Sequence, residues 1–437
     1  MEEELELFDD MTTFERTKAY ALQLDQEDRI ASFRNRFLFP QKQGSPKTYF
    51  LGNSLGLQPV SARLAMAKVL QQWADNGVES FFHGNDPWLN FHGLLVKKLS
   101  EIAGAKNSEL SIMNQLSVNI HLMLVSFYKP LGKRKKILIE SKAFPSDQYA
   151  VDSFIKLLDQ DPQDILIEVK PSGENQVLQD EDVVAAIRQH ADEIALVFIG
   201  GINYYTGHVF DMKLISDEAH KIGALVGFDL AHAIGNIELN LHDWGVDFAC
   251  WCSYKYLNAG PGAVAAVFVH DRHHLDTSLK RLTGWWGYKK EDRFLMENTF
   301  VPEPDATGWQ LSTPSIFSYA CLKASLSIFE EAGWRNILAK QHKMKGWLKF
   351  LIDDITSLEQ AHVKCITQDS RGCQVSLFFQ DNGKVVYDQL TEAGFMVDWR
   401  EPGVIRLAPV PLYNTYEEVW SFYETLKAIL TSFPFKP

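Results

Sequence analysis

The sequence predicts an α/β fold in two parts: a large domain whose mostly parallel sheet is covered by helices, and a smaller α+β domain. Between residues 110 and 269, short apolar runs alternate with helical stretches, the pattern of parallel strands joined by crossover helices. After Pro314 the pattern changes to two long helical stretches followed by separate strands. The 437 residues, 46% of them hydrophobic, also exceed what one small domain requires.

Six apolar runs of strand length predict the sheet of the large domain, at residues 137–140, 165–169, 195–199, 225–229, 248–252 and 263–269. Three helical stretches fit between them, at residues 146–158, 181–190 and 212–222. Gly223 follows the last of these, where a glycine is typical of a helix end. A continuously apolar stretch at residues 120–127 predicts a buried helix.

The remaining elements predict the smaller domain. Helices are expected at residues 316–332, 334–355 and 417–430, and strands at residues 374–379 and 404–408. The first fifty residues look helical, with a stretch at 13–31, and are expected to pack with this domain. These patterns divide the chain into an N-terminal segment (1–50), a large domain (51–315) and a small C-terminal domain (316–437).

Charge and cysteine content narrow the possible partners and location. A formal net charge of −13 argues against nucleic acid or an anionic membrane as a partner. The basic run at 133–136 is interpreted as a solvated turn. The acidic start at residues 1–4 predicts no signal peptide, and the apolar runs are too short for a membrane span. Five cysteines, an odd number without a C-x-x-C motif, favour a reducing cytoplasm.

Lys255 and Asp229 each close an apolar run that has the character of a buried strand. A lysine in that place is costly to desolvate, which favours a reactive role. The carboxyl ends of parallel strands meet at one edge of a sheet, where ligands bind. A lysine and a carboxylate at that edge are what pyridoxal phosphate requires, one for a Schiff base and the other for the pyridine nitrogen. A simple turn cap is the alternative for Asp229.

Other polar and aromatic residues are expected at the same edge. Residues 144–147 follow one strand, His232 follows another, and Tyr254 precedes the lysine. Ser117 begins the buried helix and would offer a hydroxyl and free N–H groups to a phosphate. Arg406 lies inside an apolar strand, where its planar guanidinium suits a substrate carboxylate. Structural alternatives remain: core packing for the phenylalanine and histidine, strand anchoring for the tyrosine, a helix cap for the serine, and an internal salt bridge for the arginine.

Three other motifs are rejected. Residues 260–265 imitate a dinucleotide-binding glycine loop, but they lead into a strand rather than a helix. Ser253, His232 and Asp229 lack the G-x-S-x-G turn of a hydrolase triad. The histidines lack metal-ligand spacing with cysteine or carboxylate, so no metal is expected.

The motifs that contain these residues resemble the kynureninase family, enzymes of pyridoxal-phosphate fold type I related to the class V aminotransferases. The motifs are LGNSLGL at 51–57, FPSD at 144–147, GFDLAHAIGN at 227–236, HDWGVD at 242–247, WCSYKYLNAG at 251–260, GWWG at 284–287 and RLAPVPLYN at 406–414. They extend over most of the chain, and the lysine motif is highly specific.

The resemblance implies hydrolytic Cβ–Cγ cleavage of L-kynurenine to anthranilate and L-alanine, in tryptophan catabolism or NAD biosynthesis. It implies catalytic roles for Lys255, Asp229 and Tyr254, and binding of the substrate carboxylate by Arg406. Contacts to pyridoxal phosphate are implied for Leu116, Ser117, Phe144, Pro145, Ser146, Asp147, Asp229, His232, Tyr254, Lys255, Trp285 and Thr313. Thr313 would come from a partner subunit, so the resemblance implies a homodimer with shared active sites.

Departures from the family pattern refine this expectation. Animal members have a histidine where this chain has Phe81, and an asparagine where it has Thr313. Both replacements remove partners for a ring hydroxyl, which resembles bacterial members and favours kynurenine over 3-hydroxykynurenine. Gly200 stands where a serine or threonine often contacts the cofactor, and it is left out of the site. The main rival is another class V-type reaction such as cysteine desulfuration, but that needs a mobile cysteine, and Cys250 and Cys252 lie in a predicted core strand.

Overall fold

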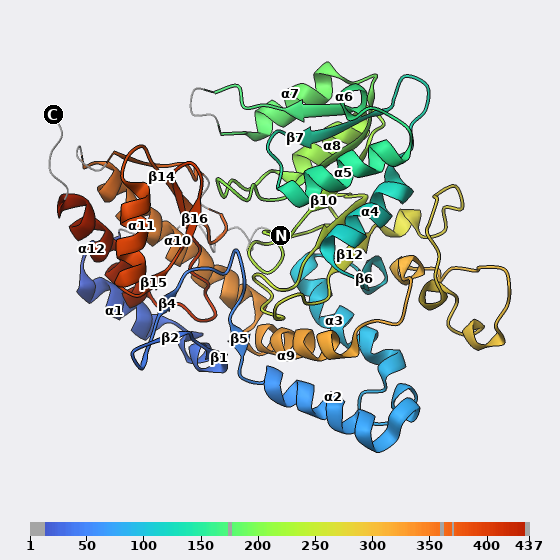
Figure 1. Cartoon of the computed structure of the whole chain (residues 1–437), viewed down its shortest axis with the longest axis horizontal. Coiled ribbons are helices and arrows are strands. Elements are labelled where there is room, and N and C mark those ends of the chain that lie inside the picture. Colours follow the sequence, from blue (N-terminus) through green and yellow to red (C-terminus); the bar gives the residue numbers. More distant parts are fainter. Residues whose placement is uncertain (1–13, 174–176, 359–361, 369–370, 433–437) are drawn as a thin grey trace, which may run out of the picture.

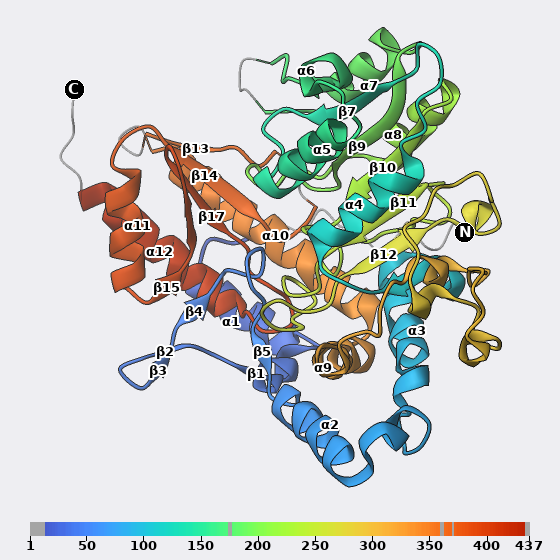
Figure 2. The same ribbon diagram turned by 45° about the vertical axis from the view of Figure 1, so that its right-hand side comes forward.

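The computed structural model describes residues 14–173, 177–358, 362–368 and 371–432. The chain forms a larger lobe, green to yellow in Figure 1, and a smaller lobe, orange to red, with the blue N-terminal helices beneath them. Figure 2 shows that each lobe is built around its own sheet. Within the described ranges, no helix is both long and apolar enough to cross a membrane.

The larger lobe holds a seven-stranded sheet. Across the sheet the strands are β6 (Leu110–Ile112), β12 (Ala266–Val269), β11 (Phe248–Trp251), β10 (Leu225–Asp229), β9 (Ile194–Gly200), β7 (Lys136–Glu140) and β8 (Leu166–Val169). The last five are mutually parallel, whereas β12 pairs antiparallel with both β11 and β6. The prediction of a mostly parallel sheet is therefore confirmed, with one antiparallel strand near its edge.

Helices cover both faces of this sheet: α4 (Leu116–Phe127), α5 (Pro145–Leu157), α6 (Pro162–Ile165), α7 (Asp180–Gln189) and α8 (Met212–Lys221). Successive strand residues point to opposite faces. In β11, Phe248 and Cys250 enter the core shared with α4 and α5. Ala249 and Trp251 enter the core shared with α7 and α8. Burial on both faces explains why these strands are continuous apolar runs in the sequence.

The smaller lobe holds an antiparallel four-stranded sheet. Its strands are β13 (Val363–Cys365), β14 (Val375–Phe379), β17 (Val404–Leu407) and β16 (Asp398–Arg400). Its helices are α1 (Lys18–Glu27), α10 (Trp334–Thr356), α11 (Gly383–Glu392) and α12 (Tyr416–Ser432). Tyr20 and Phe50 lie in the same buried cluster as Trp347 and Phe422, so helix α1 packs with this lobe. Ile30, Phe37 and Tyr49 of the N-terminal segment belong instead to the core of the larger lobe.

Helix α9 (Ile316–Ala332) packs against α2 (Ala62–Asn76) and α3 (Phe91–Ala103), and its buried residues belong to the core of the larger lobe. The two long helices expected after Pro314 are therefore present as α9 and α10, but they serve different cores. The division of the chain into segments 1–50, 51–315 and 316–437 stays a prediction.

Three sequence expectations need correction. The N-terminal helix spans residues 18–27 rather than 13–31, and residues 1–13, with the acidic start, lie outside the described residues. Short strands follow where more helix was expected: β1 (Phe37–Leu38), β2 (Gln41–Lys42), β3 (Ser45–Pro46) and β4 (Thr48–Tyr49), with partners β5 (Gln58–Pro59) and β15 (Phe395–Met396). The strand expected from residue 263 begins at Ala266, because Gly260 and Gly262 hold the preceding turn with φ of 94° and 66°.

Candidate active site

A cavity of about 160 Å³ lies at the carboxyl ends of β7, β9, β10 and β11, where ligands of open α/β sheets bind. Predicted site residues that line it are Leu116, Ser117, Phe144, Ser146, Asp147, Asp229, His232, Tyr254 and Lys255. Pro145, also predicted, lies beside them at the start of α5. Side chains that are far apart along the chain thus converge on one cavity.

Lys255 lies in the loop after β11, with 9% of its surface exposed. Its Nζ lies 5.8 Å from the centre of the Phe144 ring and 6.0 Å from that of Tyr254. Gly56 packs so closely against this loop that a Cβ there would lie 2.3 Å from the Lys255 carbonyl oxygen. The glycine in the LGNSLGL motif therefore lets this segment hold the lysine loop in place.

Asp229 and Asp147 form a hydrogen-bonded pair of buried carboxyl groups. Burial and the neighbouring Asp229 raise the pKa of Asp147 well above its usual range. Burial also raises the pKa of Asp229, although Lys255 and the hydrogen bond from Asp147 oppose this. Asp229 further accepts the Ala231 N–H at 2.7 Å, so it is the better-stabilised anion of the two. Two acids this close lose their protons one after the other, because each charge opposes the other.

Two polar atoms at the cavity are buried without a hydrogen-bond partner in the described parts of the chain: Oδ1 of Asp147 and Nδ1 of His232. Burial and the charge of Lys255 lower the pKa of His232 well below its usual range, so its ring is neutral. Burial raises the pKa of Tyr254, so its phenol keeps its proton. Because buried polar atoms are rarely left unpaired, these atoms indicate a polar ligand.

Two helices begin at the cavity. Leu116 and Ser117 are the first residues of α4, and Ser146 lies in the first turn of α5. The hydroxyl oxygens of Ser117 and Ser146 lie 2.9 Å apart. The N-cap side chains, Gln115 and Phe144, form no capping hydrogen bond to either helix, so N–H groups of the first turn of α4 remain for an anion. In α5 only the Ser146 N–H remains, because Pro145 has none and the Asp147 N–H donates to the Phe144 carbonyl oxygen. This end of the cavity suits a phosphate.

Trp285, Thr313 and Phe81 do not line this cavity. Trp285 and Thr313 are exposed, and the rings of both Trp285 and Phe81 contact Trp286, with centres 5.8 and 6.3 Å apart. The Trp286 N–H donates to the carbonyl oxygen of Leu311, two residues before Thr313. These three predicted residues therefore lie in one surface region away from the cavity of their own chain.

Arg406 is 1% exposed and also does not line the cavity. Its Nη2 forms an ion pair with Asp398 on β16, and its Nη1 donates to the Tyr204 carbonyl oxygen. The internal salt bridge considered from the sequence is thus present. Because Tyr204 lines the cavity and accepts from Nη1 of Arg406, the guanidinium lies beside the site.

Sequence reasoning missed Glu140 and Tyr204, which both line the cavity. Glu140 ends the apolar strand β7, as the predicted aspartate ends β10, so the same pattern could have identified it. Burial raises the pKa of Glu140 to about 7, although hydrogen bonds from Asn203 and Gly200 oppose this. Tyr204 lies in the loop after β9, and its ring centre is 5.2 Å from that of Phe144. No sequence pattern marks this tyrosine.

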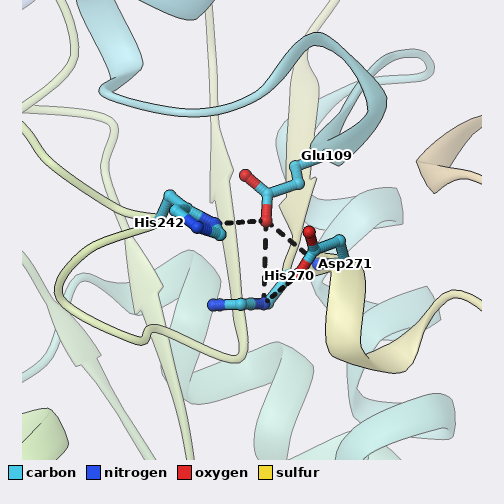
Figure 3. Close-up of side chains that lie close together, drawn as sticks. All are labelled: Glu109, His242, His270 and Asp271. Atoms are coloured by element: carbon cyan, nitrogen blue, oxygen red, sulfur yellow. Dashed lines mark hydrogen bonds and ion pairs between the residues drawn. The ribbon is translucent and has the colours of Figure 1, made fainter.

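A second group of titratable side chains lies at the opposite end of the sheet (Figure 3). Glu109, His242, His270 and Asp271 place their potential ligand atoms within 4.8 Å of one another. Oε1 of Glu109 lies 2.8 Å from His242 Nδ1 and accepts the Asp271 N–H at 3.0 Å. Its Oε2 accepts the Lys106 N–H at 2.9 Å. Both oxygens of this buried carboxylate therefore already have partners within the protein.

Comparison with protein families identifies relatives over nearly the whole chain. A family model described as the kynureninase C-terminal domain matches residues 337–426. A kynureninase of Flavobacterium psychrophilum is 47% identical over 417 residues, covering 95% of this chain and 98% of the relative. A kynureninase of Myxococcus xanthus is 46% identical over 424 residues, covering 95% and 99%.

Solved structures share the fold at low sequence identity. The cysteine desulfurase CsdA of Escherichia coli superposes with a TM-score of 0.74 at 14% identity, covering 92% of this chain and 98% of that one. A mutant of C-DES with glycine covalently linked to its PLP cofactor has a TM-score of 0.73 at 18% identity, covering 89% and 97%. The architecture is therefore that of pyridoxal-phosphate fold type I.

Proposed function

This chain belongs to the kynureninase family, and on that premise we propose that it hydrolyses L-kynurenine to anthranilate and L-alanine, and 3-hydroxykynurenine less well. The observation that carries this is the 44–47% identity to kynureninases over about 95% of the chain. The convergence of Lys255, Asp147 and Asp229 on one cavity supports it independently.

Pyridoxal phosphate is the cofactor of this reaction. When bound, it supplies an electron-accepting ring that a lysine can hold through a Schiff base. The cavity fits such a group, because the unpartnered atoms of Asp147 and His232 suit a polar heterocycle and the two helix N-termini suit its phosphate. Lys255 would hold the cofactor, Asp229 would keep the pyridine nitrogen protonated, and Phe144 would stack on the ring.

The side chains around the cavity supply the proton transfers. Lys255, as a free amine, would take the proton from the substrate Cα. Tyr254, whose phenol stays protonated, relays a proton as the Cβ–Cγ bond breaks. Water adds to the γ-carbonyl before that bond breaks, so one product is the carboxylic acid anthranilate and the other is alanine.

Arg406 would bind the substrate carboxylate, which competes with the Asp398 carboxylate for the guanidinium. This contact would orient the Cα–H bond toward the lysine. Phe81 offers no hydrogen-bonding group to a 3-hydroxyl on the aromatic ring, which supports a preference for kynurenine.

We also propose a homodimer in which Phe81, Trp285 and Thr313 complete the site of the partner. Around them lies an apolar surface region: Trp285 is 45% exposed, and its ring centre lies 5.7 Å from that of Phe294, itself 51% exposed. Contiguous exposed apolar side chains of this kind mark interaction surfaces. In such a dimer, the aromatic rings of Phe81 and Trp285 of one chain would line the cavity of the other chain.

A hybrid-dimer experiment tests the shared site. K255A and W285A should each be nearly inactive alone. Co-expressed, they should regain about a quarter of wild-type activity, since half the dimers are hybrids and each hybrid has one intact site. No recovery in proven hybrid dimers would show that Trp285 serves its own chain.

Cysteine desulfuration is not favoured as an alternative. Burial raises the pKa of Cys250 and Cys252, so neither is a reactive thiolate at neutral pH. The desulfurase structures share only the fold with this chain. The cytoplasmic location expected from the sequence remains a prediction.

The decisive experiment is incubation of the purified, cofactor-loaded protein with L-kynurenine. Anthranilate is fluorescent, so its release is followed continuously, and alanine is quantified in the same sample. Release of both products in equal amounts is expected. Sulfide release from cysteine without anthranilate release from kynurenine would refute the proposed function.

A further inference from the structure

The loop at residues 203–206 joins the two lobes through its backbone. Three consecutive carbonyl groups of this loop accept hydrogen bonds from the smaller lobe. The bonds run from Arg406 Nη1 and Gln374 Nε2 (3.0 Å) to Tyr204, from Ser376 Oγ (2.8 Å) to Tyr205, and from Thr367 Oγ1 to Thr206. The guanidinium assigned to the substrate carboxylate is therefore fastened to a loop of the larger lobe.

Asn203 determines the shape of this loop. Its Oδ1 accepts the N–H groups of Tyr205 (3.1 Å) and Thr206 (2.9 Å) and the Thr206 hydroxyl (3.1 Å). This is the local turn that asparagine side chains form with the backbone two and three residues on. Its Nδ2 points the other way and donates to Glu140 Oε2 at 2.8 Å.

Glu140 connects the loop to the floor of the cofactor cavity. It is 3% exposed, lines the cavity at the end of β7, and also accepts the Gly200 N–H at 3.3 Å. A Cβ at Gly200 would lie 3.0 Å from Glu140 Oε1, so the glycine makes room for this carboxyl group. Burying a carboxyl beside Asp147 and Asp229 costs stability, which argues that Glu140 has a role in the site.

We propose that Glu140 and Asn203 are positioning residues: their hydrogen bond holds the 203–206 loop in register and thereby places Arg406 relative to Lys255. This role rests on the proposed function, because Arg406 matters here as the anchor of the substrate carboxylate. The same loop carries Tyr204, whose ring buttresses Phe144 beside the cofactor. The hydrogen bond between Asn203 and Glu140 thus positions both Phe144, through Tyr204, and Arg406.

A double-mutant cycle in the holoenzyme tests this role. N203D keeps the oxygen that accepts from Tyr205 and Thr206 but turns the donor Nδ2 into an oxygen facing Glu140. E140Q makes residue 140 an amide, and the double variant E140Q/N203D restores a donor facing an acceptor with the polarity reversed. E109Q is the matched control, because Glu109 is an equally buried carboxylate at the opposite end of the sheet.

The variant N203D is measured at pH 8, because the Glu140 carboxyl and the new carboxyl at position 203 are then least able to share a proton. N203D should raise KM for kynurenine at least about tenfold, as expected for losing a hydrogen bond to a charged group. The kcat should fall by a smaller factor than KM rises, because Arg406 mainly binds the carboxylate and also orients the Cα–H bond. Amide exchange at residues 205 and 206 should accelerate. The double variant should return KM and the exchange rates of residues 205 and 206 to within about threefold of the wild-type values. The control E109Q should lower Tm without changing KM.

If N203D has the KM and the amide exchange rates of the wild type, this role is overturned. It is also overturned if the KM of the double variant is as high as that of the more impaired single variant. N203A replaces N203D if the latter does not fold, and it must show the same rise in KM. If the wild-type protein releases no anthranilate, the proposed function fails instead. Exchange at residues 205 and 206 would still decide whether the bond to Glu140 holds the loop.

Discussion

The two ends of the seven-stranded sheet both bury carboxyl groups and histidines, but they partner them differently. At the carboxyl ends of the strands, Glu140, Asp147 and Asp229 crowd one cavity, and burial raises the pKa of each. At the amino ends, Asp247 accepts from His220 at 2.9 Å, from His273 at 2.7 Å and from Arg272 at 2.5 Å, besides the Val226 N–H. One end is short of donors, whereas the other is saturated with them.

This difference separates function from stability within a single sheet. Burial alone would raise the pKa of Asp247, but hydrogen bonds from His220 and His273 and the charge of Arg272 lower it. A carboxylate so satisfied has no bonding capacity left for a ligand, and it stabilises the fold. The cavity end lowers the stability of the fold, because its polar groups are arranged to bind a cofactor and a substrate rather than each other.

The largest expected effect concerns the cavity end. K255A should lower turnover of kynurenine by more than about 10⁴-fold and abolish the visible absorbance of the bound cofactor, because one amine serves as both attachment point and base. Its Tm without cofactor should stay equal or rise, since a buried polar side chain is removed. Absorbance spectra, anthranilate release and thermal melts check this. An unchanged spectrum would contradict the assignment of Lys255.

The converse change at the amino end should affect stability and spare catalysis. D247N leaves Arg272 and two histidines without their anion, and loss of one partner of such a buried network costs about 3–5 kcal/mol. Since the pKa of Asp247 is lowered on folding, its contribution is present above pH ~4 and is lost as the pH falls below that. Urea unfolding at several pH values should show that D247N has a lower free energy of unfolding than wild type, and that this difference becomes smaller only in acid. Wild-type kcat/KM at low temperature is expected for D247N.

The two ends should also respond to pH with opposite sign. The pKa of Glu140 rises on folding from 4.5 to about 7, so its contribution to stability is full at low pH and is lost as the pH rises through 7. In cofactor-free protein, wild type should therefore lose up to about 3 kcal/mol relative to E140Q between pH 4 and 8. Urea midpoints across this range measure the slope. If the difference in stability between wild type and E140Q does not change between pH 4 and 8, Glu140 does not change its ionisation in that range.

The contrast also explains what the sequence could predict. Lys255 and Asp229 end apolar runs, and strand ends of a parallel sheet meet, so their convergence followed from pattern and topology together. Glu140 carries the same signal. Arg406 was correctly placed inside a buried strand, but its pairing with Asp398 depends on the antiparallel register of β16 and β17, which local sequence does not encode. Phe81, Trp285 and Thr313 were identified through family motifs alone, and they lie outside the cavity of their own chain.

The smallest expected effect concerns the histidine and acid cluster of Figure 3, whose residue types alone would suit a divalent metal. Oε1 of Glu109 already accepts the Asp271 N–H and bonds His242, and Asp271 Oδ2 lies 2.6 Å from Lys106 Nζ. A metal ion would have to displace these donors, so neither added Zn²⁺ nor a chelator should shift Tm by more than about one degree or change turnover. A Zn²⁺-dependent rise in Tm that disappears in E109Q would show that this end of the sheet also keeps bonding capacity for a ligand. The distinction between a saturated end and an unsatisfied end would then fail.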